Sequence, residues 1–164
     1  MSEDPLARVR SAARERGLDI DIRERPNARS LHEAAALLGL QPADIVKTLV
    51  VKRPSTSSGT GGGYLFALIP GDRAISWPKL RALVGVNRLR LPEAELALAA
   101  TGYERGTIVP IGSTTAWPVY ADAEIVGKRI AMGAGAHGYS LFVDADAFIA
   151  AYGATVADIS QPAD

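Results

Sequence analysis

The stretch from Thr101 to Gly112, with the sequence TGYERGTIVPIG, constrains the fold more than any other part of the chain. Three glycines and a proline interrupt what would otherwise be one passage from a helix to a strand. Glycine permits a positive φ or a close approach of the main chain to another group, and proline fixes φ while removing a donor. The stretch therefore predicts a shaped backbone wall, whose N–H groups could hold a carbonyl or phosphate oxygen that gains negative charge.

The same residues also have a purely structural interpretation. Gly102 could end a helix, Gly106 could form a bulge, and Pro110 to Gly112 could form a turn. Local sequence leaves both interpretations open, so the rest of the chain has to decide between them.

Hydrophobic periodicity and capping residues predict alternating helices and strands. The firmest signal is SLHE at residues 30–33, a capping box in which Ser30 accepts a hydrogen bond from the N–H of Glu33. Helices are expected over residues 5–16, 31–38, 77–84, 92–101 and 145–152, and strands over residues 18–22, 45–51, 64–69, 86–91, 118–120, 128–132 and 139–143. Residues 122–126 fit either a strand or a helical turn, and the tail from Gly153 is expected to be short and frayed. This order predicts a mixed α/β domain with helices packed outside a sheet.

Lys47 interrupts a β-branched run, IVKTLVV at residues 45–51, that is typical of a buried strand. Its neighbours on the same face of the strand are Ile45 and Leu49, which favour the interior. A lysine buried there without a partner would cost several kcal/mol. Lys47 therefore either points to the solvent or faces a cavity in which its ammonium has a partner.

Two further stretches are rich in small residues. Residues 53–63, RPSTSSGTGGG, predict a flexible hairpin loop, because they lack the lysine and hydroxyl residue of a Walker phosphate loop and lead into a strand. Residues 133–138, GAGAHG, predict a second loop in which His137 could contact a ligand or lie on the surface.

Composition narrows the class of protein. The 164 residues, 48% hydrophobic and 22% charged, fit a single domain over residues 1–164. The chain has no cysteine, which excludes disulfides, thiolate zinc sites and cysteine nucleophiles. The N-terminal residues are charged, so we expect a soluble cytoplasmic protein without membrane contact. Formal net charge is zero, although arginines crowd the beginning of the chain, at positions 8, 10, 14, 16, 23, 25 and 29.

Familiar catalytic arrangements are not favoured by the sequence. The two histidines, His32 and His137, do not have a metal-ligand spacing with each other or with carboxylates. His32 fits the first turn of a helix, and no Gly-x-Ser-x-Gly turn is present for a serine nucleophile. We therefore expect no metal and no cofactor.

Three motifs together resemble one known family. The run IVKTLVV, the string Gly102-x-x-x-Gly106-x-x-x-Pro110-x-Gly112, and the loop at residues 133–138 before a strand are similar to the YbaK family of aminoacyl-tRNA deacylases. The likeness extends from about Ser30 to the tail. This family is related to the editing insertion of bacterial prolyl-tRNA synthetase. The resemblance implies a mixed, curved, barrel-like sheet with helices outside.

The resemblance also implies an activity and a set of site residues. The activity is hydrolysis, in trans, of the ester that joins a wrong amino acid to tRNA, tRNA(Pro) first, with prolyl-tRNA synthetase as a candidate partner. Water or a ribose hydroxyl of the tRNA would be the nucleophile. Lys47 and Gly106 are implied as catalytic residues. The implied substrate-binding residues are His32, Thr48, Gly102, Thr107, Pro110, Gly112, Gly133, Gly135 and His137.

Departures from the family pattern bear on the substrate. In relatives that act on cysteinyl-tRNA the second loop commonly begins with serine and is followed by an acidic residue, whereas this chain has Gly133 and Ser140. The resemblance then favours alanine or another small amino acid on tRNA(Pro). Two other classes stay open: a tRNA-binding or synthetase-associated module without catalysis, and a small-ligand binding domain, which a neutral net charge also suits.

Overall fold

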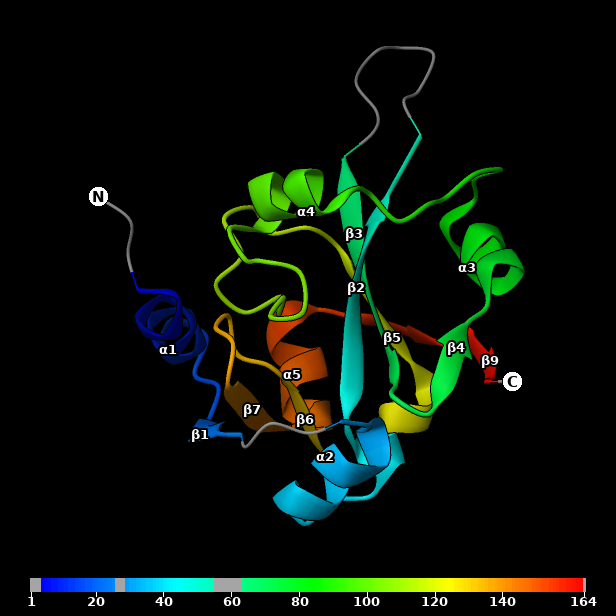
Figure 1. The fold of residues 1–164 in the computed structure, drawn as a ribbon. Coiled ribbons are helices and arrows are strands. Elements are labelled where there is room, and N and C mark those ends of the chain that lie inside the picture. The colour runs from blue at the N-terminus through cyan, green and yellow to red at the C-terminus, as the bar shows by residue number, and fades with distance from the viewer. Residues whose placement is uncertain (1–3, 26–28, 55–62, 164) are drawn as a thin grey trace.

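The computed structural model describes residues 4–25, 29–54 and 63–163, in which helices surround mixed β-structure (Figure 1). The α-helices are α1 (Pro5–Glu15), α2 (Leu31–Leu38), α3 (Trp77–Val84), α4 (Ala94–Thr101) and α5 (Ala145–Tyr152), and the 3-10 helices are η1 (Pro42–Asp44) and η2 (Ala123–Ile125). The strands are β1 (Ile20–Glu24), β2 (Val46–Lys52), β3 (Tyr64–Pro70), β4 (Arg73–Ile75), β5 (Val119–Asp122), β6 (Arg129–Gly133), β7 (Tyr139–Asp144), β8 (Thr155–Ala157) and β9 (Ser160–Pro162). The predicted α/β class is confirmed.

Helix boundaries follow the capping residues that the sequence offers. Ser30 accepts a hydrogen bond from the N–H of Glu33 at 3.1 Å, and Asp144 accepts one from Ala147 at 2.9 Å. Gly102 ends α4 with φ of 80°, in the left-handed region that favours glycine. Within the described ranges, no helix has the length and apolar character needed to cross a bilayer.

The strands form two main sheets and a short pair. The orders are β1-β7-β6, β2-β3-β5-β8 and β4-β9. In the four-stranded sheet β3 pairs antiparallel with β2 and parallel with β5. A single parallel bridge, between Ile45 and Ala131, joins the two main sheets. The strands therefore curve around a shared interior without closing into a full barrel, which fits the predicted barrel-like sheet.

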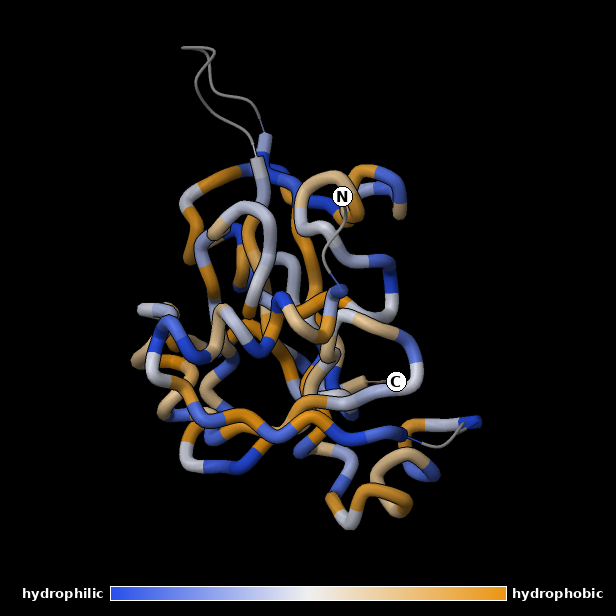
Figure 2. The backbone as a smooth tube through the Cα atoms, turned by 90° about the vertical axis from the view of Figure 1, so that its left-hand side faces the viewer, coloured by the Kyte–Doolittle hydropathy of each residue, from blue (hydrophilic) through white to orange (hydrophobic). Residues whose placement is uncertain are grey.

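Hydrophobic clusters cover both faces of the four-stranded sheet. On one face, Phe66 and Leu68 of β3 pack with residues of β6, β7, α1 and α5. On the other face, Leu65 and Ile69 of β3 pack with Leu80 of α3. Because β3 is buried on both faces, its sequence is a continuous apolar run without alternation. In the tube view, hydrophobic stretches of this kind are interrupted by hydrophilic residues at the turns (Figure 2).

The C-terminal residues are paired, which corrects the prediction of a frayed tail after Gly153. β8 runs parallel to β5, and β9 pairs antiparallel with β4. Ile159 and Ser160 are both fully buried. Strands of three residues carry too little periodicity to be recognised in a sequence, and their partners lie far away along the chain.

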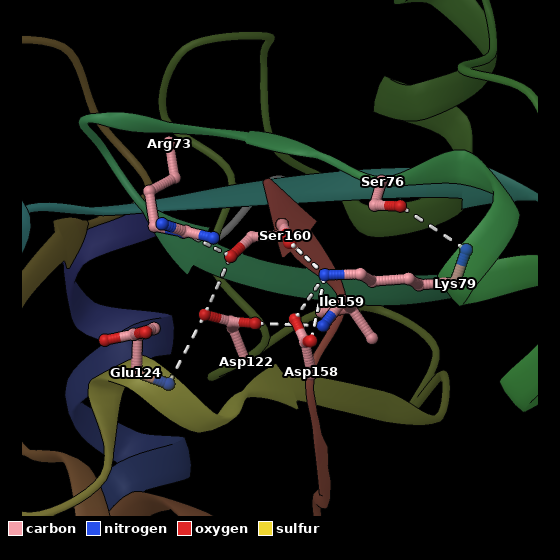
Figure 3. A network of polar contacts seen from close by, with 8 residues as sticks. All are labelled: Arg73, Ser76, Lys79, Asp122, Glu124, Asp158, Ile159 and Ser160. Carbon is pink, nitrogen blue, oxygen red and sulfur yellow. Dashed lines mark hydrogen bonds and ion pairs between the residues drawn. The ribbon is translucent and has the colours of Figure 1, made fainter. Parts of the chain in front are cut away.

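A buried carboxylate holds this tail in place (Figure 3). Asp122 is fully buried and accepts hydrogen bonds from the N–H of Ile159 at 2.9 Å and from the hydroxyl of Ser160 at 3.0 Å. The Ser160 hydroxyl accepts a hydrogen bond from Arg73 Nε at 2.7 Å. The network thus connects the C-terminal strand β9 to β4, close to the start of β2.

Three other predicted segments fare differently in the structure. The predicted strand over residues 86–91 does not form, because this stretch meets β2 only at its end, through one bridge between Arg90 and Lys52. Residues 122–126 contain the helical turn η2, which resolves that alternative. The predicted flexible loop over residues 53–63 lies mostly outside the described residues.

Candidate functional site

A cavity of about 370 Å³ lies between the edge of β2, the end of β6, the start of α4 and the loops around Gly106 and His137. This volume falls in the range of small-molecule sites, roughly 300–1,000 Å³. Most of its wall is apolar. The lining residues are Arg25, Leu38, Ile45, Val46, Lys47, Thr48, Leu49, Val50, Leu91, Pro92, Ala94, Ala97, Arg105, Gly106, Ile108, Ala131, Met132, Gly133, Ala136, His137, Tyr139 and Ser140.

The edge of β2 is bridged at both ends and open in the middle. One bridge joins Ile45 to Ala131, and the other joins Lys52 to Arg90, whose carbonyl accepts from the Lys52 N–H at 2.7 Å. Hydrogen-bonding direction alternates along an antiparallel strand, so Val50 and Thr48 direct their N–H and C=O groups to the same side as Lys52, away from β3. Main-chain donors and acceptors of β2 therefore face the cavity.

Lys47 and Thr48 leave β2 on opposite faces. Thr48 shares its face with the buried Val46 and Val50, and its Oγ1 is buried with no hydrogen-bond partner among the described residues. A buried hydroxyl without a partner is uncommon and disfavoured. Lys47 lines the cavity edge, but its side chain is exposed and its Nζ donates to the carbonyl oxygen of Arg73 at 3.0 Å. The strand thus contributes an exposed ammonium at the edge of the cavity, whereas the Thr48 hydroxyl is buried on the core face of the strand.

Gly106 forms part of the wall where the chain turns sharply. Its φ is 92°, and a Cβ built there would meet only His137, 3.9 Å away. Glycine is therefore required by the backbone conformation and not by lack of space. His137 lies across from it, with Nε2 3.1 Å from Oε2 of Glu104, and both of these side chains are 69% exposed. This pair marks the solvent side of the cavity.

Gly133 closes the wall on the β6 side for a different reason. A Cβ at this position would lie 2.7 Å from the carbonyl oxygen of Ile108 and 2.8 Å from that of Thr107. The main chains of the two loops therefore approach so closely that only glycine fits. Gly133 pairs with Ser140 of β7, and both line the cavity.

Six of the predicted site residues lie outside the cavity lining. His32 is exposed on α2. The carbonyls of Gly102 and Gly112 accept hydrogen bonds from Arg8. The other three are buried or bonded within the loops: Thr107 donates from Oγ1 to Glu104, Pro110 is buried, and Gly135 donates its N–H to the Thr107 carbonyl at 2.9 Å. The structure brings together Lys47, Thr48, Gly106, Gly133 and His137.

Two arginines at the cavity were not identified from the sequence. Arg105 precedes Gly106, and Arg25 belongs to the arginine-rich beginning of the chain. Both are exposed, and neither has an ion pair with any residue that the structure describes. The position of Arg105 inside the glycine segment was the available signal for it, whereas nothing local distinguishes Arg25 from the other early arginines.

The charged residues in the lining are all basic. Lys47, Arg25 and Arg105 contribute positive charge, and no aspartate or glutamate is among the described residues that line the cavity. Among all the residues that the structure describes, no three or more histidine, aspartate or glutamate side chains are grouped so that they could hold a metal ion. The site therefore favours an anionic ligand over a cationic one.

Comparisons with known proteins identify the family to which the cavity-forming part of the chain is similar. The family model described as "Aminoacyl-tRNA editing domain" matches residues 25–151, which include every residue of the cavity lining. The chain is 35% identical over 88 residues to a proline–tRNA ligase of Thermosipho africanus, covering 54% of this chain and 14% of the ligase. It is 36% identical over 121 residues to the proline–tRNA ligase of Shouchella clausii, covering 73% of this chain and 20% of the ligase.

The chain thus spans a fifth or less of the length of these two ligases. A solved structure of similar size is that of a candidate trans-editing enzyme for prolyl tRNA synthetase. It has a TM-score of 0.83 and 27% identity, with 98% of this chain and 99% of that chain covered. The resemblance inferred from the Lys47 strand and the two glycine loops is confirmed: this chain belongs to the aminoacyl-tRNA editing domain family.

Proposed function

We propose that the protein is a trans-editing deacylase, which hydrolyses the ester between a wrong amino acid and the terminal ribose of tRNA(Pro). The observation that carries the proposal is the cavity itself. It joins the Lys47–Thr48 strand to both glycine loops, and its charged lining residues are all basic. Two further observations support the proposal: the chain belongs to the editing domain family, and its fold matches a candidate trans-editing enzyme over nearly the whole length of both chains.

The arrangement of charge suits the acceptor end of a tRNA. Arg25 and Arg105 are exposed at the cavity and have no carboxylate partner among the described residues. Guanidinium groups bind phosphate oxygens with two parallel hydrogen bonds. In the proposed complex these arginines contact backbone phosphates, and the zero net charge of the chain is no obstacle because the positive charge is local.

Polar groups along the middle of β2 suit the aminoacyl part of the substrate. The main-chain carbonyls of Thr48 and Val50 point away from β3, toward the open edge of the strand. These oxygens can accept hydrogen bonds from the α-ammonium group. The side chain of a small amino acid would then lie near Gly133 and Ser140, where the wall is formed by small residues.

In the reaction that we propose, water attacks the ester carbonyl carbon and the bond to the ribose oxygen breaks. The ribose oxygen takes up a proton, and a free amino acid and a tRNA with two terminal hydroxyls are released. A ribose hydroxyl cannot itself be the final nucleophile, because its attack would only move the acyl group along the ribose. It can assist by exchanging a proton with the water.

Lys47 and Gly106 stabilise the charge that develops in this step. The Lys47 ammonium sits on a flexible stem and is held by a neutral carbonyl of Arg73, which a substrate oxygen of higher charge can replace. Gly106 presents main chain without a side chain at the wall, so an ester can approach it closely. Removing one donor that stabilises developing negative charge typically lowers the rate by a factor of about 10²–10³.

The test is single-turnover hydrolysis of alanyl-, cysteinyl-, seryl- and prolyl-tRNA(Pro). We expect the alanyl ester to be cleaved fastest and the prolyl ester to be spared. Lys47→Ala should lower the rate on the cleaved ester about 100-fold or more. Lys52→Ala is the matched control, because Lys52 lies on the same strand but outside the cavity lining.

Each other result has a definite meaning. Faster cleavage of the cysteinyl or seryl ester overturns the choice of alanine and keeps the deacylase. Equal rates for Lys47→Ala and the wild type refute the role of Lys47. No cleavage of any ester, with salt-sensitive tRNA binding, favours a non-catalytic binding module, whereas no tRNA binding favours a small-ligand domain.

A further inference from the structure

Arg8 of α1 binds both ends of the chain segment that carries Gly106. Its Nη2 donates to the carbonyl oxygen of Gly102 at 2.9 Å, and its Nε donates to that of Gly112 at 2.9 Å. Both glycines have φ of 80°, which turns the chain at the two ends of the segment. One guanidinium group therefore fixes the distance between the ends of the 102–112 segment.

The same guanidinium covers a buried tyrosine inside the segment. Arg8 Cζ lies 4.4 Å from the centre of the Tyr103 ring, a distance typical of a cation–π contact. Tyr103 is 1% exposed and donates its hydroxyl to the carbonyl of Ile111 at 2.8 Å. The arginine thus packs on a ring that is itself bonded across the segment.

This unit also touches the second glycine loop. A Cβ at Gly135 would lie 2.8 Å from the Tyr103 ring, so the two pack directly against each other. The Gly135 N–H donates to the carbonyl of Thr107 at 2.9 Å, one residue beyond Gly106. Arg8 and Tyr103 therefore connect both of the loops that form the cavity wall.

We propose that Arg8 is a positioning residue, which fixes the Gly106 wall in the geometry that the ester requires. The proposal rests on the proposed deacylase function for its kinetic part. Arg8 touches no residue of the cavity lining through the hydrogen bonds described above, so it acts through the 102–112 segment. It also lies outside residues 25–151, so the family match does not include it.

Arginine is suited to this task in a way that lysine is not. The planar guanidinium carries several donors at fixed angles and can bind two carbonyls while stacking on an aromatic ring. An ammonium group at the end of a flexible stem binds at one point. Arg8→Lys should therefore keep the charge and lose the double contact, which separates electrostatics from geometry.

The residue that caps the C-terminal end of α1 supplies a matched control. Arg16 donates from Nη1 to the carbonyl of Ala151 at 3.0 Å, and its Cζ lies 4.0 Å from the centre of the Tyr152 ring. These are the same two kinds of contact, directed at the end of α5. None of these residues lines the cavity.

The experiment compares Arg8→Ala, Arg8→Lys and Arg16→Ala by amide hydrogen exchange and by single-turnover deacylation. For Arg8→Ala we expect exchange at the Gly135 amide to rise about tenfold. The limiting deacylation rate should fall about tenfold, with the tRNA concentration at half-maximal rate within twofold of wild type. For Arg8→Lys, both the exchange at Gly135 and the limiting deacylation rate should lie between those of Arg8→Ala and the wild type. Arg16→Ala should change neither quantity.

Three results would overturn the proposal. The first is unchanged exchange at Gly135 in Arg8→Ala. The second is faster exchange with an unchanged limiting rate, which would make the contact purely structural. The third is an equal loss of rate in Arg16→Ala. If the wild type cleaves no ester, the proposed function fails by itself, and the exchange at Gly135 still decides whether Arg8 fixes the loops.

Discussion

The two ends of the chain lie on opposite sides of the molecule, with α1 on one side and β9 beside β4 on the other (Figure 1). At the N-terminal end, the cation of Arg8 binds backbone carbonyls that belong to the Gly106 segment. At the C-terminal end, the carboxylate of Asp122 binds Ser160, which binds Arg73, whose carbonyl holds Lys47. We call these sets of contacts the N-terminal brace and the C-terminal brace.

The braces differ in burial, and this difference predicts different consequences of mutation. Arg8 is half-buried, so water can replace part of what it loses. Asp122 and Ser160 are fully buried, so donors that lose them have no access to water. A broken contact in the C-terminal brace should therefore lower global stability strongly, whereas one in the N-terminal brace should act more on the loops.

The largest effect is expected for Asp122→Ala. The change leaves the N–H of Ile159 and the hydroxyl of Ser160 without their acceptor in a buried site. We expect a loss of about 3 kcal/mol in the free energy of unfolding, measured by urea denaturation. Asp122→Asn is the control, because asparagine keeps the shape of the side chain and one acceptor oxygen. Its free energy of unfolding should fall less than that of the alanine variant. A loss below about 1 kcal/mol for the alanine variant would contradict the burial argument.

Ser160→Ala should have the next largest effect. It removes the donor to Asp122 and the acceptor of Arg73 Nε, both at 3.0 Å or less. Because both partners are charged, we expect a loss of about 2 kcal/mol by the same measurement. Ser113→Ala is a suitable control, since the buried hydroxyl of Ser113 has no hydrogen-bond partner in the described structure. If Ser160→Ala and Ser113→Ala lost the same free energy of unfolding, the contacts of Ser160 in the C-terminal brace would contribute no extra stability.

Tyr103→Phe tests the N-terminal brace with the removal of one hydroxyl. The Ile111 carbonyl loses its bond from the Tyr103 hydroxyl, while the ring stays under Arg8. We expect a loss of about 1 kcal/mol, again from urea denaturation, because both partners are neutral. The comparison of the braces would fail if this variant were less stable than Ser160→Ala.

The smallest effect is expected at an exposed ion pair beside the C-terminal brace, in which Lys79 binds Asp158 and the carbonyl of Ser160. The hydrogen bond from Lys79 holds the pKa of Asp158 below its usual value of 3.8. A lowered pKa in the folded state stabilises the fold when the pH is above the pKa of the unfolded state, and this contribution is lost as the pH falls through the lowered folded-state pKa. The pair is exposed, so the contribution is slight. Asp158→Asn should lower the urea midpoint slightly at pH 7, and the difference should shrink as the pH falls through the lowered pKa of Asp158. A difference that grew as the pH fell would contradict the assignment.

The predictable parts of this fold are those with local signals. Ser30 and Gly102 mark helix ends by their own chemistry, and the apolar run of β3 needs no partner to be recognised. The tail could not be predicted, since β9 is held by Asp122, 38 positions away from Ser160. Pairing at that distance leaves no pattern in three residues.

Only part of the candidate site was predicted from the sequence. Lys47, Thr48, Gly106, Gly133 and His137 were named from the sequence and line one cavity, while their roles stay predictions. Gly102 and Gly112 belong to the same motif but serve to turn the chain where Arg8 binds it. Glycine spacing reports where the backbone is unusual, and only the fold tells which unusual positions face a ligand.

The open edge of β2 has one more consequence, for the solubility of the protein. An unpaired strand edge can pair with the same edge of another molecule, which leads to aggregation. Lys47 and Lys52 place positive charges on this strand, and charged residues on an edge strand discourage such pairing. The same open edge faces the cavity, so the lysine proposed to serve the reaction also carries one of the charges that disfavour self-association of the edge.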